Sequence, residues 1–163
     1  MIYIQTLDRY WNPSIKLLKG ASKKEISAFQ KYLAKEFIRL FKLSIEKQRY
    51  RAKWVELTPG YLEYKRRHGL STNIWEATGQ LKSSIRLFKI GRYNYSIGFD
   101  KRRNHIGSKA KLHKIARWME YGTMRMPPRP LFRLIYRYMS SNISYFYDKY
   151  LKEGGSKLWV KVA

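Results

Sequence analysis

Residues 115–133 read Ile-Ala-Arg-Trp-Met-Glu-Tyr-Gly-Thr-Met-Arg-Met-Pro-Pro-Arg-Pro-Leu-Phe-Arg, and a long apolar-periodic segment follows them. Gly122 can adopt a positive φ at no steric cost. Three prolines in the second half of this stretch fix φ, remove backbone donors and hold the residues before them extended. We therefore predict a stiff loop over residues 122–130 that presents Arg125 and Arg129 from a defined backbone. On composition alone, the loop could equally be a connection with no binding role.

Two long helices are predicted, one on each side of this loop. Ser22 and Glu25 have the spacing of a capping box, and an apolar stripe follows them at helical spacing, so we predict a helix from Ser22 to about Arg49. A second stripe predicts a helix over Leu131–Leu151. The aromatic residues of the first stripe are expected in the core rather than around a cofactor.

Between the long helices the pattern predicts a short helix and a β-hairpin. Thr58 and Pro59 suit the N-cap and first position of a helix that continues to His68. Alternating apolar residues predict strands over Ser84–Ile90 and Tyr93–Phe99, joined by a turn. The residues just before the first strand suit either a helical turn or a strand.

Together these elements predict one α+β domain over residues 1–163, in which two long helices pack on a small antiparallel sheet with a central β-hairpin. We also expect a short strand over Ile2–Thr6 and a short helix within Trp11–Lys19. A C-terminal tail over about residues 154–163 could add a strand to a sheet edge of this chain or of a neighbour.

Charge is the strongest compositional signal. The chain has 35 Lys and Arg against 11 Asp and Glu, a formal net charge of +24, whereas solubility requires a magnitude of only about 2–8. Such an excess favours a polyanionic partner, most often nucleic acid, with an acidic protein or a membrane surface as alternatives. The chain has no cysteine, which fits the cytoplasm, and no apolar run approaches the roughly 20 residues of a membrane span.

The sequence contains no recognisable catalytic or metal-binding pattern. The three histidines, His68, His105 and His113, have no acidic residues at metal-ligand spacing, and Gly-rich phosphate loops are absent. A small basic ribonuclease using only His and Lys remains a minor alternative. We therefore predict that the protein is not an enzyme, has no catalytic residues and needs no cofactor or metal.

A basic loop is predicted over residues 101–114, which are rich in Lys and Arg and contain no acidic residue. Such a polar segment should be mobile on its own. It is either a solvated loop or a surface that faces DNA or an acidic neighbour. The residues predicted to face DNA are Lys101, Arg102, Arg103, Lys109 and Lys111.

Three stretches of the chain occur together and in a defined order. They are Trp-Val-Glu-Leu-Thr-Pro-Gly-Tyr at 54–61 with Lys-Arg-Arg at 65–67, Ala-Thr-Gly-Gln-Leu-Lys-Ser-Ser-Ile at 77–85, and Ala-Arg-Trp-Met-Glu-Tyr-Gly-Thr at 116–123 with Pro-Arg-Pro-Leu-Phe at 128–132. This ordered set resembles the tail-completion and head–tail joining proteins of tailed bacteriophages, which are also called neck or virion-morphogenesis proteins. The resemblance covers roughly Trp54 to Met139.

The resemblance implies a structural virion protein of the phage neck, assembled in the host cytoplasm. Such proteins form a homo-oligomeric ring, commonly a hexamer, between the connector or adaptor and the terminator or tube proteins of the tail, and genomic DNA passes through the lumen. Contacts that close a ring head to tail use two different surfaces of each subunit. From their charge and loop position, we predict that Glu120, Arg125 and Arg129 make these contacts. The alternative is a basic nucleic-acid-binding protein that recognises DNA in solution.

Overall fold

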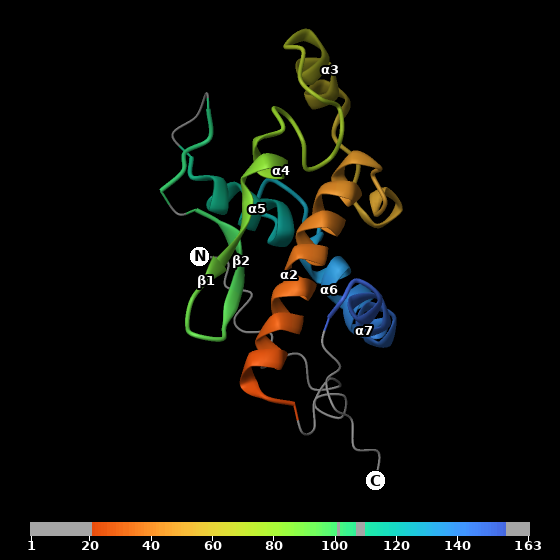
Figure 1. Cartoon of the computed structure of the whole chain (residues 1–163). Helices are drawn as coiled ribbons and strands as arrows, with labels where there is room; N and C mark the ends of the chain where they lie inside the picture. The colour runs from red at the N-terminus through yellow and green to blue at the C-terminus, as the bar shows by residue number, and fades with distance from the viewer. Residues whose placement is uncertain (1–20, 101, 107–109, 156–163) are drawn as a thin grey trace.

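A computed structural model describes residues 21–100, 102–106 and 110–155. Within these residues, a two-stranded antiparallel sheet packs beside helix α2 at one side of a mainly helical domain, which confirms the predicted α+β fold (Figure 1). The predicted strand at 2–6, the predicted helix within 11–19 and the tail from residue 156 lie outside the described residues.

Helix α2, Lys23–Glu46, is the long helix on which the hairpin and three of the shorter helices pack (Figure 1). Its predicted capping box is confirmed: the Ser22 hydroxyl accepts from the Glu25 backbone N–H at 3.3 Å, and the Glu25 carboxylate accepts from the Ser22 N–H at 2.8 Å. These bonds satisfy donors that a helix start leaves without partners. One face of α2 is buried against the hairpin, and against α6, Phe132–Ser141, and α7, Ile143–Lys152.

The central hairpin consists of β1, Ile85–Lys89, and β2, Tyr95–Phe99, in the antiparallel register that places Ile85 opposite Phe99. The segment before β1 is a helical turn, α4, Gln80–Ser84. Upstream, the 3-10 helix η2 covers Arg51–Lys53 and helix α3 covers Pro59–Arg67. The Thr58 hydroxyl accepts from the Tyr61 N–H, so the predicted N-cap is confirmed.

The prediction of one helix over Leu131–Leu151 is wrong, because the helix is broken between α6 and α7. Asn142 has φ −119° and ψ 30°, and its side-chain amide donates to the Tyr138 carbonyl at 2.8 Å. Asparagine side chains compete with the backbone for such carbonyls and disfavour a helix interior. After the break, α7 packs against α2, where Lys149 pairs with Glu36 at 3.2 Å.

The core is centred on Phe41 of α2. Its ring lies 5.0 Å from Phe132 of α6, 5.9 Å from Trp75 and 6.2 Å from Phe99 of β2, measured between ring centroids. The aromatic stripe of α2 is therefore core, as predicted. None of the helices within the described ranges is long and apolar enough to cross a membrane.

Candidate functional site

The loop over residues 122–130 follows α5, Leu112–Tyr121, and is held rigidly at its first residue. Gly122 has φ 78°, and its N–H donates to the Trp118 carbonyl at 2.7 Å. A Cβ at this position would lie 2.8 Å from the Met126 carbonyl oxygen and 2.9 Å from the Pro128 nitrogen. Gly122 thus adopts the positive φ that the sequence allows, and glycine suits this backbone conformation and close approach because it has no Cβ.

Arg129 ties the loop to three other segments. Its Nε donates to the Val55 carbonyl at 2.7 Å and an Nη to the Glu56 carbonyl at 3.1 Å. Its backbone N–H donates to the Met119 carbonyl at 2.7 Å, and its own carbonyl accepts from the Trp75 indole at 2.8 Å. The residue is 4% exposed, and this desolvation lowers the pKa of the guanidinium. Arg129 therefore connects the loop to α5, to the chain before α3 and to the segment around residue 75.

Glu120, which is 2% exposed, caps the N-terminus of α6 although it lies 11 residues before Leu131 in the sequence. Its carboxylate accepts from the backbone N–H groups of Leu131 at 2.7 Å, Phe132 at 2.9 Å and Arg133 at 3.1 Å. The Arg133 guanidinium also donates to it at 3.3 Å. A carboxylate at a helix N-terminus satisfies orphan donors and complements the helix dipole.

Glu120, Arg125 and Arg129 were all predicted to make subunit contacts, but they differ in exposure. Glu120 and Arg129 are buried inside the protomer, where their bonds are intramolecular, so neither side chain is offered to a neighbouring subunit. Arg125 is exposed on the loop, as its predicted role requires. One sequence signal could have identified Glu120: α6 begins after Leu131, which has no side chain able to cap a helix. Another group had to satisfy those N–H donors.

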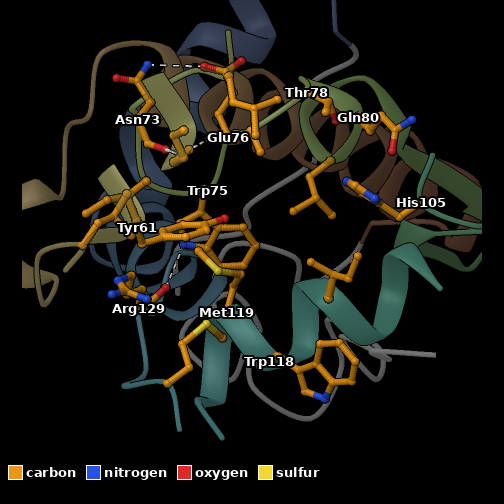
Figure 2. A pocket seen from close by; sticks show the side chains of 18 of the residues that line it. Tyr61, Asn73, Trp75, Glu76, Thr78, Gln80, His105, Trp118, Met119 and Arg129 are labelled. Carbon is orange, nitrogen blue, oxygen red and sulfur yellow. Dashed lines mark hydrogen bonds between the residues drawn. The ribbon is translucent and has the colours of Figure 1, made fainter. Parts of the chain in front are cut away.

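A cleft of about 680 Å³ lies beside the loop (Figure 2). It is bounded by α3, the segment over residues 70–81, α5, part of the basic loop and the loop after Gly122. In Figure 2, Tyr61 of α3 and His105 of the basic loop lie on opposite sides of the opening, and Trp118 projects from α5. The apolar residues that line it include Tyr61, Tyr64, Trp75, Trp118, Met119 and Met126.

Several large apolar side chains at the cleft are exposed. Tyr61 is 45% exposed, Tyr64 49% and Trp118 41%, and Met124, on the loop that borders the cleft, is fully exposed. We call these four residues the apolar rim. A contiguous patch of exposed apolar side chains commonly marks an interaction site, whereas single exposed apolar residues are normal.

Lys65, which the sequence places in a basic cluster of α3, is instead buried under the cleft at 2% exposure. Its amine donates to the carbonyls of Asn73 at 2.8 Å and Glu76 at 2.6 Å. Burial lowers the pKa of this amine from 10.5 to about 8. The side chain therefore fixes the wall of the cleft and is not part of a solvent-facing charge cluster.

We expect Lys65 to give the protein a specific pH dependence of stability. Its pKa is about 8 in the folded protein and near 10.5 when unfolded, so the unfolded state binds more protons between these values and the free energy of unfolding rises with pH there. Relative to Lys65→Met, the wild type should gain about 3 kcal/mol across this window. Urea denaturation of both proteins at several pH values tests this. A difference that stays constant across the window would contradict it.

The described residues of the basic loop, 102–106 and 110–114, are anchored by hydrogen bonds. The His105 N–H donates to the Ala110 carbonyl at 2.9 Å, the Ile106 N–H donates to the Gln80 side chain at 2.9 Å, and Asn104 forms an isolated bridge with Lys111. Arg102 and Arg103 are exposed, and Lys111 is half-buried. Lys101 and Lys109 lie outside the described residues. That this loop faces DNA remains a prediction.

Comparison of the chain with family models, with curated proteins and with solved structures finds no match. Within the described ranges, no three His, Asp or Glu residues gather in a way that could hold a metal ion.

Proposed function

We propose that this protein is a non-enzymatic structural subunit of the phage neck, which assembles into a ring between connector and tail. The observation that carries the proposal is the convergence of all three resembling stretches on one site. Trp54 of the first stretch donates to the Pro130 carbonyl of the third at 2.7 Å, and Arg129 binds the carbonyls of the first. Ala77 and Leu81 of the second stretch line the same cleft. The three stretches thus lie together in the folded protein, around the cleft and the loop after Gly122.

The apolar rim supports this surface as the contact between subunits. Interface cores are enriched in aromatic residues and methionine and depleted of charge, which matches Tyr61, Tyr64, Trp118 and Met124. Arg125 lines the same cleft and could fix register there. Because a ring closes by heterologous contacts, the cleft of one subunit would receive a different face of its neighbour. The partners in the virion would be the connector or adaptor and the tail proteins.

Nucleic-acid binding in solution is the second candidate, and the charge favours it. The glutamates of the described chain are largely engaged by Lys or Arg, for example Glu56 with Arg51 at 2.8 Å and Glu63 with Arg67 at 2.9 Å. Because Lys and Arg outnumber Asp and Glu 35 to 11, most of the positive charge is not neutralised within the protomer. A neck ring that surrounds DNA and a free DNA binder both fit this excess, and we favour the ring because the apolar rim also offers a contact between subunits.

The absence of native cysteine provides a direct test of the subunit contact. Met124→Cys places one thiol per subunit on the apolar rim, and Tyr145→Cys, on α7 outside the cleft, is the matched control, since Tyr145 is 58% exposed. We expect maleimide labelling of the thiol at position 124 to slow as protein concentration drives assembly, while labelling at position 145 stays constant. Equal labelling of both at every concentration would contradict the proposed contact.

Trp118→Ser should weaken the same assembly. Truncation of a central aromatic residue in an interface commonly costs about 2 kcal/mol, which corresponds to roughly a 30-fold higher dissociation constant. Light scattering over a concentration series measures this shift, and Tyr145→Ser serves as the control. No shift relative to that control would exclude the cleft as the subunit contact.

A further inference from the structure

The outer face of α2 carries a straight line of lysines. Lys24, Lys31, Lys35 and Lys42 are exposed, and they follow one another at intervals of seven, four and seven residues. Seven residues advance a helix by almost two turns and four by slightly more than one, so these side chains project within roughly 20° of one line. At 1.5 Å per residue the line is about 27 Å long. The helix that carries this line is labelled α2 in Figure 1.

The opposite face of α2 forms the core, so the lysine line cannot turn inward. Phe29, Leu33, Phe37 and Leu40 on that face are at most 5% exposed. The lysines therefore point to solvent from a helix whose position is fixed by packing. We call the four lysines the α2 lysine face.

The charge of this face is not neutralised within the described part of the protomer. None of the four lysines forms an ion pair with a described residue. The central glutamate of the helix, Glu36, is buried and engaged by Arg39 at 2.9 Å and Lys149 at 3.2 Å. Glu46, at the end of the helix, pairs with Lys82 at 3.4 Å. Among the described residues, the face is thus a row of four cations without an acidic partner.

We propose that the α2 lysine face contacts the sugar-phosphate backbone of duplex DNA, an inference that rests on the proposed passage of DNA through the ring. Lysine binds phosphate as a flexible point charge without a directional requirement, which suits contacts that carry no sequence information. With a rise of about 3.4 Å per base pair, the line matches about eight base pairs of duplex.

The composition of this face also selects among nucleic acids. Proteins that hold single strands stack bases on aromatic side chains. The exposed aromatic residues of the described chain lie on α3, α5, α6 and α7, and none belongs to α2. The α2 lysine face therefore offers charge without stacking, which fits an intact duplex.

The α2 lysine face and the basic loop differ in the acidic residues near their cations. Arg102 and Arg103 form a short cluster next to Asp100, whose carboxylate accepts from the Arg102 N–H at 2.9 Å. This acid weakens the local field of the loop. Next to the α2 lysine face, exposed Ala28 and partly buried Ile38 carry no charge, and the acid on the same side of the helix, Glu46, is engaged by Lys82 at 3.4 Å. We infer that α2, more than the loop, supplies the DNA contact.

Two charge-matched variants test the inference. The first replaces the α2 lysine face by Lys24→Gln, Lys31→Gln, Lys35→Gln and Lys42→Gln. The control removes the same charge elsewhere by Lys53→Gln, Lys89→Gln, Arg137→Gln and Lys152→Gln, all exposed and all outside the basic loop. Urea denaturation first establishes that both variants fold. The affinity of each protein for a short fluorescein-labelled duplex of arbitrary sequence is then measured over a salt series.

Each lysine that neutralises a phosphate contributes about 0.9 to the slope of log affinity against log salt. The α2 variant should therefore lose about 3 to 4 from the magnitude of this slope, while the control stays near the wild type. Equal losses in both variants, or none in the α2 variant, would overturn the inference. If a single strand binds more tightly than the duplex, the proposal that the partner is a duplex is wrong. If polyglutamate binds as tightly as DNA, the proposal that the partner is a nucleic acid is wrong.

The mass of each protein in solution separates this inference from the proposed function. We expect the α2 variant to assemble like the wild type, because its substitutions lie outside the apolar rim. Assembly without an α2 contribution to DNA binding would reject the DNA-facing role alone. A wild type that never assembles would reject the ring, whatever its salt slope.

Discussion

Glu120→Ala is expected to lower the free energy of unfolding by about 3 to 5 kcal/mol, since it removes one partner of a buried charged network. The substitution leaves the backbone N–H groups of Leu131 and Phe132 buried without acceptors. It also removes the only side chain that caps α6 among the described residues. The start of α6, which positions Phe132 in the core, should then loosen.

Urea denaturation of Glu120→Ala and Arg133→Ala measures this effect with an internal control. The Arg133 side chain is 53% exposed, so its pairing with Glu120 is weakened by solvent and its loss should cost less than about 1 kcal/mol. The capping of α6, and not the ion pair, accounts for most of the effect. Equal losses in the two variants would show that the carboxylate does not act as a cap.

Gly122→Ala should cost about 3 kcal/mol, which is the upper range for backbone strain at a single residue. An alanine here must hold φ near 78° while its Cβ meets the Met126 carbonyl oxygen at 2.8 Å and the Pro128 nitrogen at 2.9 Å. The strain would displace the loop that carries Arg129 and would open the cleft. Thermal or urea unfolding, together with loss of assembly, reports both consequences.

Gly60→Ala is the matched control for this substitution. Gly60 lies in α3, and a Cβ added there meets nothing within 4 Å. Alanine favours a helix over glycine by up to about 1 kcal/mol, so this variant should be neutral or slightly more stable. If Gly122→Ala behaves like Gly60→Ala, the rigid-loop account fails.

Elements encoded by local patterns were predictable from the sequence. The capping box at Ser22, the N-cap at Thr58 and the alternation that makes the hairpin all rest on residues a few positions apart. The side chain of Asn142 also acts locally, on the carbonyl of Tyr138, but Asn142 falls on the helical stripe, and the stripe alone predicts an unbroken helix.

The construction of the site was not predictable in the same way. Arg129 reaches carbonyls 73 and 74 positions away, and Glu120 caps a helix that begins beyond the loop. A charged residue beside a rigid loop has the same sequence pattern whether it faces solvent or a buried carbonyl. Lys65 illustrates this, because its acceptors are backbone carbonyls that carry no sequence signature.

A ring that closes through the cleft and surrounds DNA must assemble to a fixed size. The mass of the purified protein in solution, with and without duplex DNA, across a salt series, tests this directly. We expect a discrete multiple of the 19.7 kDa chain that forms without DNA. A monomer at every concentration that binds duplex DNA tightly, with affinity falling steeply in log salt, would contradict the ring and favour a DNA-binding protein.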